Sequence, residues 1–268
     1  MLFAPQEFGG AGVKREIVSR RNLQAIIFAL SFVAPAAAFV VPMQTAHASG
    51  IVQISPVLLD LTGDNAVGIV NFGNQDHEPT TIQVRVFKWR QANGQESLEP
   101  TSDVVASPPM AEIAPGASLS IRVVRASGTP ITGEDSYRLV IDQLPQARDS
   151  GKAVVAMLLR QVLPVFFSSG RRTDPSVAWS IVGRGGRQTL VARNDGDRRL
   201  RVGKVTISGG HGSVSMGGAL LGYVLGHSVM SWTIPAKGGA FAVGSTVAIK
   251  GQGDVGAISA AAPVVAAQ

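Results

Sequence analysis

The feature that most constrains the fold is a succession of short segments in which apolar and polar residues alternate. In TTIQVRVFKWRQ (80–91), Ile82, Val84 and Val86 face one way, and the residues between them are mostly polar or aromatic. A period of two is typical of a β-strand with one buried face. The pair Asn93-Gly94 follows directly, and it is a strong signal for a tight β-hairpin.

Comparable segments recur along the first half of the chain and are separated by turn-forming residues. They include GIVQISPVLLDL, NAVGIVNFGN, ASLSIRVVR and SYRLVIDQLP. We therefore expect about seven short strands between Ile51 and Ser169. The 31 glycines, the 15 prolines and the low charged fraction of 16% also suit a turn-rich β protein. The spacing predicts an all-β chain that begins with a two-sheet sandwich of immunoglobulin type.

A change in composition at SSGRRTDP (168–175) indicates a domain boundary. Beyond it lie further short segments, richer in glycine and with weaker alternation, such as RQTLVARNDG and AFAVGSTVAIKG. We expect residues 49–170 to form an N-terminal sandwich and residues 171–268 to form a C-terminal β-sandwich domain. The small, apolar tail AISAAAPVVAAQ is expected to be a final edge strand or a frayed end.

The first 48 residues have the pattern of a cleavable secretory signal peptide. Basic residues precede the apolar stretch LQAIIFALSFVAPAAAFVV, and small residues in TAHAS predict cleavage after Ala48. A membrane anchor is the alternative, but Pro35, Pro42 and the cleavage site disfavour it. The mature chain would carry 20 basic and 16 acidic residues. This mild, scattered excess does not predict binding to nucleic acid.

The sequence offers no recognisable site for catalysis, a metal or a cofactor. It contains no cysteine, which excludes disulfides, thiolate metal sites and a cysteine nucleophile. His77, His211 and His227 lie far apart and form no metal-ligand pair. The segment GHSVM begins like a nucleophile elbow, but Met230 occupies the place of its second glycine. We therefore expect a protein that is not an enzyme.

One segment, AVVAMLLRQVLPVFF (153–167), is apolar on both faces over its first half. It is too short for a membrane helix and contains Arg160, Gln161 and Pro164. A sandwich buries only one face of each strand, so this strand has apolar surface to spare. Either that surface packs under the preceding loop or against the second domain, or it is offered to a partner whose own core is incomplete.

The order of several motifs resembles that of the periplasmic pilus-assembly chaperones, and most closely their archaic branch. The motifs are VQISPVLLDL, TTIQVRVFKWRQANGQ, LEPTSDVVASPPMAEIAPGASLSIRVVR, YRLVIDQLP and LLRQVLPVFF. The resemblance covers most of residues 50–170. It is weaker over 175–250, where GYVLGHSVMSWTIP is similar to the pattern of the second domain.

The resemblance implies two immunoglobulin-like domains in tandem, set at an angle, in a cofactor-free protein of the periplasm. Such a chaperone binds pilin (fimbrial) subunits by donor-strand complementation, in which its strand completes the subunit's fold. It prevents premature aggregation of the subunits and delivers them to an outer-membrane usher for fimbrium biogenesis. When free, it is open to self-capping as a homodimer. The alternative for an exported all-β chain is a secreted β-sandwich adhesin or structural fibre subunit.

The resemblance also implies which residues of the apolar segment enter the subunit. These are the bulkier alternate residues Val155, Met157 and Leu159, with Ala153 and Gln161 at the ends. The opposite face would present Val154, Ala156 and Leu158 instead.

Two charged sites of the family have no obvious counterpart here. The better-known branch grips the subunit's terminal carboxylate with an arginine and a lysine, but Pro56 and Pro164 align with those positions. Either the carboxylate is not anchored, or Arg160, Arg85 or Lys88 takes over. For the interdomain ion pairs, the resemblance points to Asp135 and Asp254. Ser168 replaces the expected basic partner, which leaves Arg171 or Arg172 as substitutes.

Overall fold

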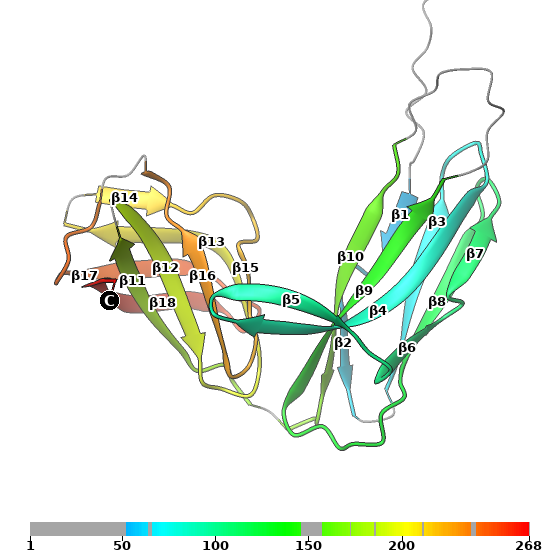
Figure 1. Cartoon of the computed structure of the whole chain (residues 1–268), viewed down its shortest axis with the longest axis horizontal. Helices are drawn as coiled ribbons and strands as arrows, with labels where there is room; N and C mark the ends of the chain where they lie inside the picture. Colours follow the sequence, from blue (N-terminus) through cyan, green and yellow to red (C-terminus); the bar gives the residue numbers. More distant parts are fainter. Residues whose placement is uncertain are drawn as a thin grey trace, which may run out of the picture. The chain divides into compact units, whose positions relative to one another are not determined.

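The computed structural model describes residues 52–63, 66–145, 157–171, 173–184, 186–210, 212–236 and 240–267 (Figure 1). These residues are mostly β-strand, which confirms the predicted all-β class. Among them, no helix is long and apolar enough to cross a membrane. The predicted signal peptide, residues 1–48, lies outside this part of the chain.

Residues 52–168 form two facing sheets. The first has the strand order β1 (Val52–Ser55), β3 (Val67–Asn74), β8 (Ser118–Arg125) and β6 (Val104–Ser107). The second has the order β2 (Leu59–Thr62), β10 (Arg160–Ser168), β9 (Glu134–Leu144), β4 (Thr80–Ala92) and β5 (Gln95–Pro100), with β7 (Met110–Ile113) also on β4. Alternate apolar residues of both sheets meet in one core, which includes Val70, Ile121 and Leu139.

The first sandwich has more strand segments than the seven expected from its sequence. One reason is that the chain passes from one sheet to the other at Pro56, so the segment VQISPVLLDL supplies both β1 and β2. The peptide bond between Ser55 and Pro56 is cis at this crossing. The short strands β5, β6 and β7 also add to the number.

The predicted hairpin at Asn93-Gly94 joins β4 to β5. Both residues have positive φ angles, 53° and 76°, as the tight turn requires. The tip of this hairpin also contacts the second half of the chain. Gly94 forms a bridge with Met230, and the Ser231 hydroxyl donates a 3.1 Å hydrogen bond to the Gly94 carbonyl.

Replacing Gly94 with alanine is expected to destabilise the protein by roughly 1–2 kcal/mol, because a side chain is strained at positive φ. The new Cβ would also lie 2.3 Å from the Ser231 Oγ atom, so this contact must shift. The measurement is urea denaturation of the variant beside Gly116→Ala. That turn glycine also has a positive φ, but its Cβ would meet nothing within 4 Å. Equal losses in the two variants would contradict the contribution of the Ser231 contact.

Residues 177–266 form a second set of strands around a separate core. Its sheet has the order β14 (Gly212–Ser215), β13 (Leu200–Gly209), β17 (Thr246–Gln252), β18 (Ala257–Ala266), β11 (Val177–Arg184), β12 (Arg187–Asn194) and β16 (Ser228–Thr233). β15 (Gly222–Val224) pairs with β13. The core gathers inward-facing residues such as Ile181, Leu190, Ile207 and Ile249.

The C-terminal tail forms a regular strand, β18, rather than a frayed end. β18 pairs antiparallel with β17 over Ala257–Pro263 and then in parallel with β11 over Val264–Ala266. Its small alternate residues Ala262 and Val264 are buried in the core. The tail therefore contributes to the core of the second half, and it joins β17 to β11.

An aromatic cluster connects the strands of the two halves. Trp89 of β4, Phe166 of β10 and Tyr223 of β15 are buried together, with ring centroids 5.7–5.8 Å apart. Next to them, the buried Gln91 side chain donates to the Tyr223 carbonyl and accepts from the Leu225 amide, both at 2.9 Å. The rings and this paired amide therefore form one continuous contact between the halves.

Candidate functional site

The second part of the apolar segment forms β10, and this strand has one incompletely paired edge. On one side, β10 pairs with β9 from Arg160 to Ser168. On the other side, β2 reaches only Val165–Ser168. In the part of the chain that the structure describes, no strand pairs with Arg160–Pro164 on that side. Unpaired backbone groups at such an edge are a template for a strand of another chain.

The core-facing residues of β10 form a row that continues beyond the core of the first sandwich. Leu163, Val165 and Phe167 of this row are buried. The alternate positions before them are Gln161, Leu159 and Met157, and Met157 is 71% exposed. A partner strand added to the open edge would extend the same sheet, so this row would face the partner's interior.

The opposite face of the segment is also exposed. Leu158 is 48% exposed, and Arg160 and Val162 are exposed as well. The predicted site residues Ala153 and Val155, and Val154 and Ala156 on the alternative face, lie outside the described residues. Of the five predicted subunit-binding residues, the structure therefore describes three: Gln161 lies on β10, and Met157 and Leu159 come directly before it.

Two of the predicted anchoring cations share a single carboxylate. Asp142 on β9 accepts a hydrogen bond from Arg85 at 2.6 Å through Oδ2, and one from the Nε atom of Arg160 through Oδ1. Desolvation alone would raise the pKa of the Asp142 carboxyl, but the hydrogen bonds and positive charges of Arg160 and Arg85 hold that pKa below its usual value. The carboxylate thus connects three adjacent strands, β4, β9 and β10.

The lowered pKa of Asp142 predicts how stability depends on pH. A carboxyl group with a depressed folded-state pKa stabilises the protein above its unfolded value, and this contribution is lost as the pH falls through the folded value. Asp142→Asn removes the titrating group. We therefore expect wild type to be more stable than Asp142→Asn at pH 7, and the difference to shrink below about pH 4. Urea denaturation at a series of pH values measures it, and a constant difference would contradict the assignment.

The third predicted anchoring cation, Lys88, is paired within the first sandwich. Its Nζ atom donates to Asp135 at 2.8 Å and to the Tyr137 hydroxyl at 3.3 Å. Asp135 also accepts from Arg125 at 3.3 Å. The structure therefore places Asp135, which the resemblance assigns to the interdomain contact, in an ion-pair cluster of its own sandwich.

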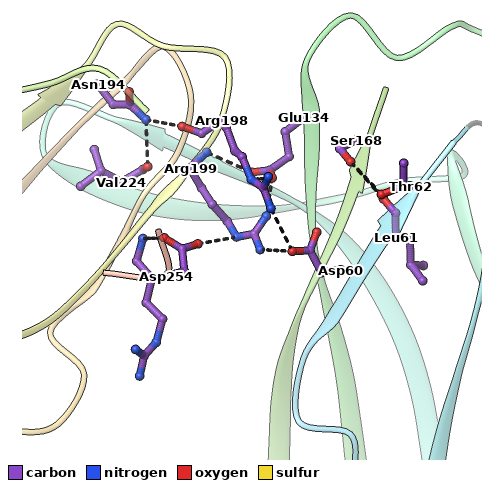
Figure 2. Close-up of polar contacts among 11 residues, drawn as sticks. Asp60, Leu61, Thr62, Glu134, Ser168, Asn194, Arg198, Arg199, Val224 and Asp254 are labelled. Atoms are coloured by element: carbon purple, nitrogen blue, oxygen red, sulfur yellow. Dashed lines mark hydrogen bonds and ion pairs between the residues drawn. The ribbon is translucent and has the colours of Figure 1, made fainter. Parts of the chain in front are cut away.

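Arg199, immediately before β13, lies at the centre of the charged cluster that connects the two halves (Figure 2). Its side chain is 2% exposed and donates to Glu134 at the start of β9 and to Asp60 of β2, the latter at 2.7 Å. Asp254 lies 3.8 Å from the Arg199 Nε atom. Burial raises the pKa of the Glu134 carboxyl, because desolvation outweighs the favourable charge of Arg199.

Of the two acidic residues predicted for this contact, Asp254 belongs to the cluster and Asp135 does not. Strand alternation is the signal that separates Glu134 from Asp135. Tyr137 and Leu139 face the core, so Asp135 shares their side and Glu134 projects from the other. No comparable signal identifies Arg199, because it comes from a run of basic residues in the second half of the chain. Arg172, one of the suggested substitutes, lies outside the described residues.

Within the described residues, no group of three or more histidine, cysteine, aspartate or glutamate side chains converges to hold a metal ion. The charged groups that do converge, around Asp142, Asp135 and Arg199, are paired as ions. The feature that distinguishes the chain is therefore an open strand edge with exposed apolar side chains.

Comparison with known protein families finds a match over the first half of the chain. Residues 51–169 match the N-terminal domain of PapD, described as a pili and flagellar-assembly chaperone. A search of curated proteins finds no match.

Three solved structures of similar fold cover most of the chain. One is the complex of CsuC with CsuE, a chaperone and tip adhesion subunit from archaic chaperone–usher Csu pili of Acinetobacter baumannii. It has 23% identity and a TM-score of 0.63, and covers 82% of this chain and 100% of that chain. The Salmonella enterica SafA pilin in complex with the SafB chaperone has 15% identity, a TM-score of 0.54, and coverages of 78% and 95%. The E. coli chaperone DraB has 16% identity and a TM-score of 0.53, and the alignment covers 78% of this chain and 97% of that chain.

At these identities the likeness is one of fold. It extends over more of the chain than the first sandwich, because each alignment covers at least 78% of the sequence. The predicted class, all-β with immunoglobulin-like sandwiches in tandem, is thereby confirmed.

Proposed function

Residues 51–169 match the pili and flagellar-assembly chaperone family, and from this premise we propose that the chain captures pilin subunits by donor-strand complementation. In this function it prevents premature aggregation of the subunits and delivers them to an outer-membrane usher. The donated residues are Ala153, Val155, Met157, Leu159 and Gln161.

The open edge of β10 is the observation that carries the proposal. Strand addition needs unpaired backbone groups and side chains at alternate positions that fit the partner's pockets. Arg160–Pro164 lacks a described strand on one side, and Met157 lies exposed just before it. Complexes with pilin or tip subunits, such as those of SafB and CsuC, support a partner of the same class for this chain.

The apolar side chains supply most of the binding free energy in this proposal. Fully burying one large apolar side chain contributes roughly 1.5–3 kcal/mol. Val155, Met157 and Leu159 together would contribute about 5–9 kcal/mol before the cost of ordering the partners. That sum needs no ATP and no covalent step, which agrees with a binding protein rather than an enzyme.

The subunit's terminal carboxylate has three candidate anchors: Arg160, Arg85 and Lys88. Each is already paired with a carboxylate, Asp142 or Asp135. A subunit would bind there only by sharing a cation or displacing its partner. Arg85 and Arg160 remain substantially exposed and have further N–H donors, whereas Lys88 is mostly covered.

The domain assignment completes the proposal. Residues 1–48 act as an export signal to the periplasm, 49–170 form the sandwich that carries the donor strand, and 171–268 form the C-terminal domain. When no subunit is bound, the same open edge of β10 is available to a second copy of the chain, which would cap both copies as a homodimer.

Co-expression provides the test. The chain is expressed with tagged pilin-like proteins encoded beside its gene, and periplasmic extracts are purified through the tag. We expect the chain to be recovered with at least one pilin and to remain in the periplasm. If it were instead found in extracellular fibres and bound no pilin, the alternative of an adhesin or structural fibre subunit would replace the proposal.

A further inference from the structure

We propose that Asp142 and Gln143, adjacent residues of β9, are positioning residues that hold the end of the donor segment (153–161) in one register before a subunit arrives. This inference rests on the proposed function and adds to it a way in which the register of the donor segment is fixed. The two side chains form hydrogen bonds with the segment from opposite faces of the sheet, at the point where β10 begins.

Gln143 holds the backbone of Leu159 through two hydrogen bonds. The Gln143 amide donates to the Leu159 carbonyl at 3.0 Å, and its side-chain Oε1 atom accepts from the Leu159 amide at 3.1 Å. The side chain is buried, and its Nε2 atom reaches the Thr80 hydroxyl of β4 at 3.5 Å. The side chain of Gln143 thus helps to extend the pairing with β9 to Leu159, the residue directly before β10.

Asp142 holds the next residue, Arg160, from the other face. It lies opposite Arg160 in the strand register and accepts a hydrogen bond from its guanidinium. Its second oxygen accepts from Arg85 of β4. Asp142 is 8% exposed although both arginines reach solvent, so the buried carboxylate ties the end of the donor segment to the middle of the sheet.

These contacts matter because the segment has little other support here. Its second edge meets no described strand before Val165, and Met157 and Leu158 are exposed. A shift of one residue would exchange the two faces and turn Leu158 and Arg160 toward the subunit. Holding Leu159 and Arg160 at fixed partners prevents that exchange and lowers the ordering cost of binding.

The first measurement concerns the free protein and needs no ligand. Gln143→Ala and Asp142→Asn are compared with wild type by hydrogen–deuterium exchange of peptides covering 157–163 and, as a reference, 119–125 of β8. We expect about tenfold faster exchange at 157–163 in both variants, and no change in β8. Glu99→Gln is the control, because it removes an exposed ion pair with Arg90 at the far edge of the same sheet. Unchanged exchange at 157–163 would overturn the inference.

The second measurement uses the tagged pilin recovered with wild type in the co-expression test. Both variants are expected to capture it about tenfold less tightly, while Glu99→Gln and the charge-retaining Asp142→Glu capture it nearly as wild type does. Faster exchange with undiminished capture would overturn the positioning role and leave the proposed function standing. If wild type captures no pilin, the proposed function fails, and the role of these residues in capture fails with it.

Discussion

Met157→Asp is expected to leave the chain folded and to abolish recovery of a co-expressed pilin. Met157 is exposed in the free protein, so a charge costs little there. In the subunit's groove the same position would be buried, and the variant would lose roughly 1.5–3 kcal/mol of apolar burial and leave a carboxylate without a partner. Affinity purification of the tagged pilin and thermal unfolding of the free variant measure the two effects separately.

Leu159→Asp tests the next residue of the same row and is expected to lose capture as well. Leu159 is partly covered in the free chain, so a small loss of stability should accompany this change. Val105→Asp is the matched control: Val105 is 50% exposed on β6, in the other sheet. It should keep both fold and capture. Normal recovery of the pilin by Met157→Asp and Leu159→Asp would refute donation of this row.

Leu158→Asp separates the two faces of the segment. Leu158 is exposed like Met157 but points to the opposite side of the strand. Retained capture is expected if the row of Met157 and Leu159 enters the subunit. Loss of capture in Leu158→Asp, together with normal capture in Met157→Asp, would show that the opposite face is donated.

Local patterns in the sequence predicted the elements of the fold well where side chains alone decide them. The alternation in 80–91 and the pair Asn93-Gly94 gave β4 and the turn after it, because both depend on neighbouring residues. The segment that is apolar on both faces suggested a strand with an exposed edge, and the structure has such an edge on β10 at Arg160–Pro164. A surplus of apolar surface in one strand is visible before any partner is known.

Features that depend on distant parts of the chain could not be predicted in the same way. Which strands pair decides the passage of VQISPVLLDL between sheets, and it decides how β18 pairs first with β17 and then with β11. In the charged contact the structure has the predicted Asp254 together with Glu134 in place of Asp135, and strand alternation on β9 is the local signal that distinguishes these two adjacent acidic residues. Arg199 meets Glu134 and Asp60 across 65 and 139 positions of sequence, a separation at which composition carries no signal.

Arg199→Met is expected to reduce the free energy of unfolding by about 3–5 kcal/mol, since it removes one partner of a buried ion pair and leaves the other charge uncompensated. Glu134 is almost fully buried, and Arg198 lies 3.8 Å from it as a weaker partner. Methionine keeps much of the apolar volume that covers the Phe166 ring, 3.7 Å from the Arg199 guanidinium carbon. The loss therefore reports the charge more than the packing. Urea denaturation, followed by circular dichroism and tryptophan fluorescence, measures it.

The size of this effect depends on burial, and two further variants test that dependence. Arg193→Met breaks an ion pair whose side chains are both well exposed, so its cost should stay below about 1 kcal/mol. The double variant Arg199→Met, Glu134→Leu also removes the buried carboxylate that has lost its partner. It should regain a large part of the lost unfolding free energy, because no charged group then has to be desolvated at this place. If Arg199→Met proved no more harmful than Arg193→Met, the buried cluster would contribute little. The aromatic cluster of Trp89, Phe166 and Tyr223 would then be the main contact between the two halves.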